Sequence, residues 1–128
     1  WVEESQHVKI DVIEFNRLAQ GLTTEDFDEV YREYNAMILG FVEALHAQAQ
    51  MCVADICKFE ARNLSRKQQV TLVEFVANCF CTGLLKYGFE HTQFKRITAD
   101  IYPDFQLRFA QTSQEIDNTL ASLVAQGE

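Results

Sequence analysis

The side chains best suited to chemistry are two pairs of glutamate and histidine. Glu4 precedes His7, and Glu43 precedes His46, by three residues, a spacing that places carboxylate and imidazole on one face of a helix. Two such pairs, with glutamates from two further helices, form the ligand set of a carboxylate-bridged di-iron bundle. Because Glu43 lies about 160° around its helix from the apolar residue Leu45, we expect it to face solvent. The sequence therefore favours surface pairs, and a metal- or cofactor-binding bundle is the alternative.

The four cysteines offer a second possible metal site. If the chain folds back near residue 64, residues whose numbers add to about 127 face each other, which brings His46 near Cys81 and leaves Cys52 within about two turns of Cys79. Thiolate and imidazole are zinc ligands. However, Cys79 and Cys81 point about 200° apart on a helix, so they do not converge on one ion. We expect free, buried thiols and a reducing, cytoplasmic compartment.

The sequence contains no recognisable catalytic motif. It has no Gly-x-Ser-x-Gly element, which positions the nucleophile in many hydrolases, and no glycine-rich phosphate loop. We therefore expect no enzymatic activity and no cofactor.

A stripe of apolar residues at spacings of three and four predicts one long helix, over about residues 24–62. Thr23 or Thr24 is the expected N-cap, followed by acidic residues that the helix dipole favours. The stripe consists of Phe27, Tyr31, Tyr34, Ile38, Phe41, Leu45, Ala49, Cys52, Ile56 and Phe59.

Shorter helical patterns lie on both sides of this helix. A first helix is expected to stop at Gly21, and Asp11 with Glu14 could start it late. Ser65 begins a third helix that is apolar on two sides and so is expected to be central. Pro103 predicts a break near Tyr102 before the last helix. The predicted fold is all-α, an antiparallel helical bundle of four to five helices in a single helical domain, residues 1–128.

Charge and hydropathy narrow the range of partners. Of 128 residues 48% are apolar, and the net charge is −8. Residues 1–43 carry −7, residues 44–96 carry +3 and residues 97–128 carry −4. An acidic protein lacks the cationic footprint that nucleic acid requires, and no uninterrupted apolar run reaches the roughly 18 residues of a membrane span. We therefore expect neither direct binding of nucleic acid nor a membrane partner. Because the chain starts with Trp1, we expect a processed product or one part of a longer protein.

The aromatic content and the long helix favour a protein partner. The long helix exceeds its neighbours in length, so part of its apolar stripe is expected to remain for a second copy or another protein. The sequence predicts an acidic interaction module, such as an adaptor, chaperone, regulator or inhibitor, and a homodimer; a purely structural assembly subunit is a further alternative. The predicted partner-binding residues are Glu25, Asp26, Asp28, Glu29, Tyr31, Glu33 and Tyr34.

Overall fold

The computed structural model confirms the all-α helical bundle with one long helix. It describes the backbone of residues 2–59 and 63–126 and the side chains of residues 10–59 and 63–126. Those residues form helices and connecting turns, with no strand among them. The elements in chain order are α1 (Val2–Ala19), α2 (Thr24–Phe59), α3 (Arg66–Phe80), the π-helical segment η1 (Cys81–Lys86), α4 (Tyr87–Glu90), α5 (Thr92–Ile101) and α6 (Phe105–Gln126).

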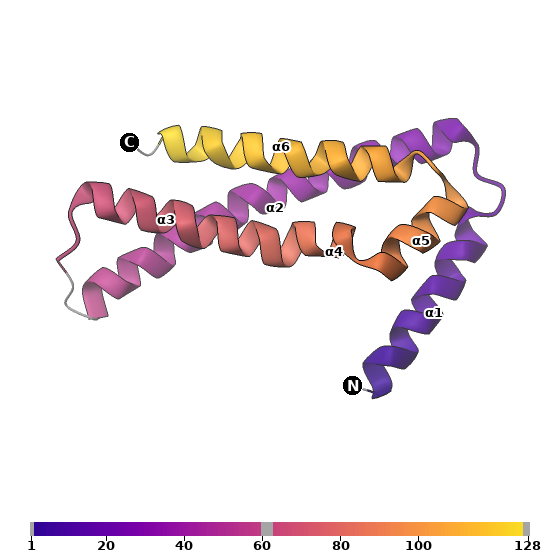
Figure 1. Cartoon of the computed structure of the whole chain (residues 1–128), viewed down its shortest axis with the longest axis horizontal. Coiled ribbons are helices and arrows are strands. Elements are labelled where there is room, and N and C mark those ends of the chain that lie inside the picture. Colours follow the sequence, from indigo (N-terminus) through magenta and orange to yellow (C-terminus); the bar gives the residue numbers. More distant parts are fainter. Residues whose placement is uncertain (1, 60–62, 127–128) are drawn as a thin grey trace.

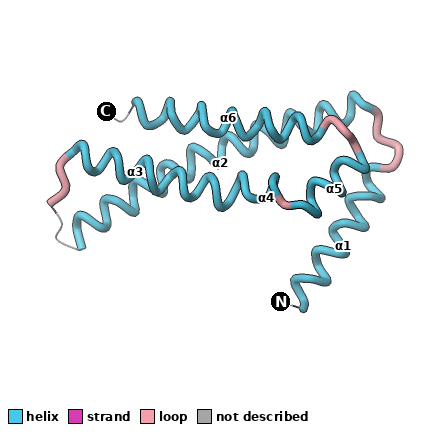
Figure 2. Tube along the Cα trace, in the orientation of Figure 1, coloured by secondary structure: helices cyan, strands magenta, loops and turns pink. Residues whose placement is uncertain are grey.

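Helices α2, α3 and α6 pack side by side, and α1 projects away from them at one end (Figure 1). The chain turns back between α2 and α3, so these two helices are antiparallel (Figure 2). Helix α6 runs in the same direction as α2, and α5 connects the end of α4 to the start of α6. The contact between α2 and α6 is thus parallel and is formed by segments far apart in the sequence.

The helix boundaries follow the local sequence signals closely. Gly21, with a φ of 93°, ends the first helix in a conformation that residues with a side chain rarely adopt. Ser65 and Gln68 form the predicted capping box of α3. Helix α5 ends at Ile101, beside the predicted break at Tyr102. The first helix begins at Val2, so the alternative late start at Asp11 is wrong.

The sequence predicted both the N-cap of the long helix and the residue at which it ends. Of the two possible N-caps, the structure selects Thr23, because α2 begins at Thr24. The helix is described as far as Phe59, and the remaining predicted residues 60–62 lie outside the described residues.

The apolar stripe on α2 is confirmed at Phe27, Ile38 and Ala49, which are buried, but elsewhere the buried positions lie one residue after the predicted ones. Val42 is fully buried, whereas its predicted neighbour Phe41 is 50% exposed. His46 and Val53 are likewise buried one position after the predicted Leu45 and Cys52. The cause is tertiary packing: α3 and α6 cover the flank of α2 that carries Val42, so the flank that carries Phe41 is left open.

Helix α3 is not the central helix that the sequence predicted, since Ala77 is the one residue of Arg66–Phe80 that is buried. In the segment η1 that follows, the Tyr87 N–H donates to the Thr82 carbonyl, so the turn is wider than that of an α-helix. Leu84 and Tyr87, predicted to face the core, are 67% and 71% exposed, and Phe89 is buried instead. Phe75 of α3, an apolar residue of the helix predicted to be central, is also exposed.

The start of α2 gives a first testable prediction. Thr23 donates to Asp26 Oδ2 from both its backbone N–H and its hydroxyl, each at 2.7 Å. These hydrogen bonds favour the carboxylate and hold the pKa of Asp26 below its ordinary value of 3.8. The lowered pKa means that this cap stabilises the fold above the ordinary carboxyl pKa, and that the contribution is lost as the pH falls through the folded value.

We expect Thr23→Ala to raise the pKa of Asp26 toward its ordinary value, because one of the two donors is removed. A carbon-detected NMR titration of the carboxyl group measures this change. Thr71→Ala, on the exposed side of α3, is the control and should leave Asp26 unchanged. An Asp26 that titrates identically in all three proteins contradicts the prediction.

Candidate functional site: an apolar groove between four helices

An apolar groove of about 200 Å³ opens where α1, α2, α5 and α6 meet. Its side chains are almost entirely aromatic or aliphatic. Phe15 on α1 and Val30 on α2 are 40% and 50% exposed, so the groove communicates with solvent. The lining residues are Phe15, Val30, Tyr31, Tyr34, Phe94, Thr98, Phe105 and Phe109.

Stacked aromatic rings form the floor of the groove. Phe109 lies 5.1 Å from Phe89, 5.2 Å from Phe94 and 5.6 Å from Phe105, measured between ring centroids. Tyr34 meets Phe109 edge to face at 6.2 Å. Because four rings from different helices fix the position of Phe109, the floor is a preformed surface.

The two tyrosines that the sequence selected as partner-binding both line this groove. The Tyr31 hydroxyl donates to the Arg108 carbonyl at 2.9 Å, which ties its ring to α6. Burial raises the pKa of Tyr34, so this phenol stays neutral over the physiological pH range. The tyrosines therefore offer ring surface rather than charge to a ligand.

A polar network behind the groove was missed by sequence reasoning. Thr112, fully buried on α6, donates to Asn35 Oδ1 at 2.7 Å and lies 2.9 Å from the Tyr31 hydroxyl. Asn35 in turn donates to Glu115 Oε2 at 2.6 Å. One polar residue on an otherwise apolar helix face is the only sequence signal for such a network, and it does not identify the partners.

The acidic residues selected as partner-binding divide into two groups. Asp26 caps α2, and Asp28 forms an ion pair with Arg108 of α6. Both therefore interact within the protein. Glu25, Glu29 and Glu33 are exposed on the first turns of α2. They place negative charge on α2, the helix that contributes Val30, Tyr31 and Tyr34 to the groove.

Apolar surface continues from the groove along α2. Val30, Met37 and Phe41 lie on one face of this helix, and each is at least half exposed. The accessible surface of the molecule is 9099 Å², whereas a compact monomer of 14.7 kDa has about 6,900 Å². The excess of about 2,200 Å² is larger than the roughly 800 Å² that each partner contributes to a standard interface.

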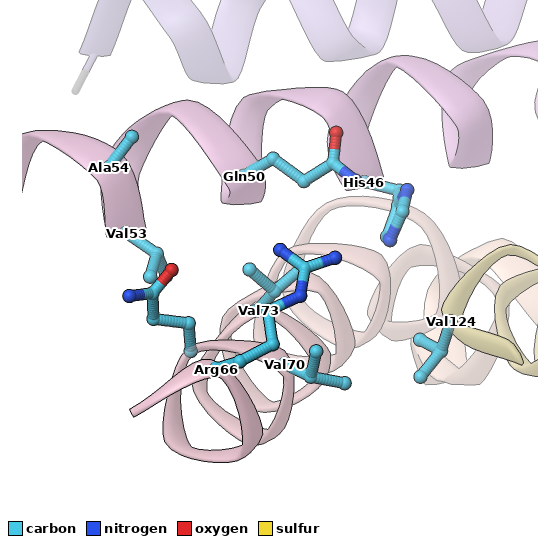
Figure 3. Close-up of a pocket in the computed structure, with 9 residues that line it drawn as sticks. His46, Gln50, Val53, Ala54, Arg66, Val70, Val73 and Val124 are labelled. Atoms are coloured by element: carbon cyan, nitrogen blue, oxygen red, sulfur yellow. The ribbon is translucent and has the colours of Figure 1, made fainter. Parts of the chain in front are cut away.

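The candidate metal ligands are not brought together in the described part of the chain. Among those residues there is no group of three or more His, Cys, Asp or Glu side chains that could hold a metal ion. Glu43 is exposed, and the side chains of Glu4 and His7 lie outside the described residues. His46 and Val73 line one pocket between α2 and α3 (Figure 3), and Cys81 is not among the residues that line it.

The four cysteines are free, as predicted. Cys81 is buried, and burial raises the pKa of its thiol, against an opposing effect of Lys86. The protonated form is thus favoured at this position. Cys79, predicted to be buried, is exposed.

Comparison with known proteins finds no match. No family model, no curated protein and no solved structure is significantly similar to this chain.

Two helical segments, Thr24–Phe59 and Arg66–Glu90, are long and apolar enough to cross a membrane by length and composition. Their most apolar stretches of 18 residues have mean hydropathies of 1.3 and 1.2. Core helices of soluble proteins meet the same criterion, so this is a weak indication. The expected absence of a membrane partner stays a prediction.

Proposed function

We propose that this protein is an acidic helical interaction module that binds an amphipathic helix of another protein in the groove between α1, α2, α5 and α6. The groove itself carries the proposal. It combines an open mouth at Phe15 and Val30 with a rigid aromatic floor around Phe109. Grooves of this kind accept the apolar side chains that a helix presents at positions i, i+3 or i+4, and i+7.

Charge indicates the chemistry of the partner. Glu25, Glu29 and Glu33 are exposed on α2, which contributes three residues to the groove, and the first 43 residues carry a net charge of −7. A helix flanked by Lys or Arg complements this rim, which speeds association and selects against acidic competitors. The apolar continuation through Met37 and Phe41 gives such a helix further surface along α2.

A pair of synthetic peptides tests the proposal. Both carry the same leucines at helical spacing; one has lysine flanks and the other glutamate flanks. We expect the lysine peptide alone to bind, more weakly as salt rises, because part of the attraction is electrostatic. Isothermal titration calorimetry at two salt concentrations measures this.

Val30→Glu is expected to lower the affinity for the lysine peptide about tenfold or more, because the new carboxylate lies in the apolar mouth of the groove. Leu107→Glu on α6, a residue that is 64% exposed and outside the groove, is the matched control and should bind like the parent protein. The proposal is contradicted if the two peptides bind with equal affinity. It is also contradicted if Val30→Glu and Leu107→Glu lose the same affinity for the lysine peptide.

Light scattering of the parent protein and of Val30→Glu completes the test. A monomer that binds the lysine peptide supports the proposal. A dimer that Val30→Glu converts to a monomer overturns it, because the groove is then occupied by a second copy. Flotation with lipid vesicles that depends on Val30, without peptide binding, overturns it in favour of a membrane surface.

A further inference from the structure

A second apolar surface lies on the continuous helical rod Arg66–Glu90, which is made of α3, η1 and α4 (Figure 1). Between Lys67 and Lys86 the rod carries a single charged side chain, Glu74. Its most apolar stretch of 18 residues has a mean hydropathy of 1.2, yet only 11% of that stretch is buried in the described part of the chain. An apolar helix that its own protein leaves uncovered is typical of an interaction surface.

The buried residues of the rod mark its inner side. They are Ala77, Cys81 and Phe89, each at most 4% exposed. Residues two positions apart point about 200° apart on a helix, so Phe75, Cys79 and Tyr87 lie on the outer side. Phe75 and Tyr87 are 64% and 71% exposed, and Cys79 is exposed between them. We call this side the outer face of the rod.

The shape of the outer face is complementary to itself. Phe75 lies four residues before Cys79, and Gly83 lies four residues after it. Among the described residues, no atom of a neighbouring element lies within 4 Å of the position that a Cβ of Gly83 would take, so the space beside this glycine is open. When two rods pair antiparallel about a two-fold axis at Cys79, the Phe75 ring of each copy therefore meets the open space beside Gly83 of the other.

The charges at the two ends of the rod are complementary in the same arrangement. Lys67 lies 12 residues before Cys79 and Glu90 lies 11 residues after it, and both are exposed. The antiparallel pair thus places Lys67 of each copy beside Glu90 of the other, once on each side of the axis. Glu90 also pairs with Lys95 of its own chain at 2.5 Å, so the contact between copies extends an existing ion pair.

The exposed area of the molecule is sufficient for this contact in addition to the groove. The excess of about 2,200 Å² over a compact monomer is more than twice the roughly 800 Å² that each partner contributes to a standard interface. A lipid surface suits the outer face less well. Glu74 is exposed next to Phe75 and the whole chain carries −8, so an anionic bilayer repels the protein.

We propose that a second copy of this chain covers the outer face of the rod, in an antiparallel two-fold pair centred near Cys79. The homodimer that the sequence predicted is thereby assigned to α3 and η1 rather than to the apolar stripe of α2. The surface is separate from the groove, and the proposal does not depend on the function assigned to the groove.

Sedimentation equilibrium of the parent protein and three variants tests the proposal. We expect the parent to be a dimer of twice 14.7 kDa. Phe75→Glu is expected to raise the dissociation constant about 100-fold or more, because the two-fold axis places the new carboxylate in the contact twice. Gly83→Gln fills the open space beside the helix and should weaken the dimer about tenfold or more, while circular dichroism stays unchanged. Met51→Glu, at a residue of α2 that is 61% exposed, is the matched control and should dimerise normally.

The same measurement separates this dimer from other ways of covering the two surfaces. A protein that stays monomeric at about 1 mM overturns the proposal, since so weak a contact is not a stable interface. A dimer that both Phe75→Glu and Gly83→Gln leave unchanged also overturns it. Val30→Glu in the groove should not dissociate the dimer, and a dimer that it does dissociate places the second copy in the groove instead. A monomer that floats with vesicles of phosphatidylcholine and phosphatidylglycerol, and requires Phe75 to do so, overturns the proposal in favour of a membrane surface.

Cross-linking tests the antiparallel arrangement. A short bismaleimide should join two copies through Cys79, and the product should be lost in Cys79→Ser but retained in Cys57→Ser. In a mixture of unlabelled and ¹⁵N-labelled protein, a carbodiimide joins an amine to a nearby carboxylate with loss of water. We expect an amide between Lys67 of an unlabelled copy and Glu90 of a labelled copy, identified by mass spectrometry. A dimer that forms neither link overturns the pairing of the two rods.

Discussion

Replacing Phe109 by alanine is expected to destabilise the protein by about 4 kcal/mol, the largest effect of any single substitution argued for this chain. Phe109 is 8% exposed and contacts the rings of Tyr34, Phe89, Phe94 and Phe105. These rings come from α2, α4, α5 and α6, so no single neighbouring helix can move to fill the space. The cost therefore contains both the lost burial and the cavity that remains.

Urea unfolding followed by circular dichroism measures this difference. Leu107→Ala is the matched control, because it removes a large apolar side chain two residues away on the same helix. Leu107 is 64% exposed, so we expect a change of no more than about 0.5 kcal/mol. If the two variants lose similar stability, the floor of the groove is not the packed centre described above.

Local signals in the sequence were sufficient for the ends of the helices. Ser65 with Gln68, Gly21 and Pro103 each act through atoms within a few residues, so their effect does not depend on the rest of the fold. The long helix was predictable for a similar reason, because its apolar spacing runs through many turns.

The faces of the helices could not be predicted in the same way. Phe41 is more apolar than His46, yet His46 is buried and Phe41 is half exposed. Which flank of α2 is covered depends on where α3 and α6 cross it, a tertiary property. The π-helical turn of η1 also has no clear sequence signal, and it exchanges Leu84 and Tyr87 for Phe89 in the core.

The groove was only partly accessible from the sequence. Tyr31 and Tyr34 were selected because they lie at the edge of the stripe, and both line the groove. Phe94 and Phe105 come from α5 and α6, and nothing in the residue spacing places them opposite α2. The pocket lined by His46 and Val73 was unpredictable for the same reason, since its lining residues come from α2, α3 and α6.

The buried polar network gives the second large expected effect. Thr112→Val keeps the shape of the side chain but removes the hydroxyl that donates to Asn35 and contacts Tyr31. Thr112 is fully buried, so water cannot replace the lost donor. We expect a loss of about 2 kcal/mol in the free energy of unfolding, because a partly buried amide oxygen is left unsatisfied.

A double-mutant cycle with Asn35→Leu checks that the loss arises from this contact. If it does, the double variant loses less than the sum of the single variants, since both polar partners are then gone. Thr71→Val, on the exposed side of α3, is the control and should change stability by no more than about 0.5 kcal/mol. Strict additivity of Thr112→Val and Asn35→Leu contradicts the prediction.

The position of the network explains why it matters beyond its own energy. Helices α2 and α6 are parallel neighbours, and the chain passes through α3, η1, α4 and α5 between them. No short loop therefore fixes the position of α6 along the axis of α2. Apolar side chains tolerate a shift of one helical turn better than hydrogen bonds do. The hydrogen bonds from Thr112 to Asn35 and from Tyr31 to Arg108 form at only one position of α6 along the axis of α2. Tyr31 is also a wall of the groove, so Thr112→Val should weaken peptide binding as well as stability, whereas Leu107→Ala should change neither.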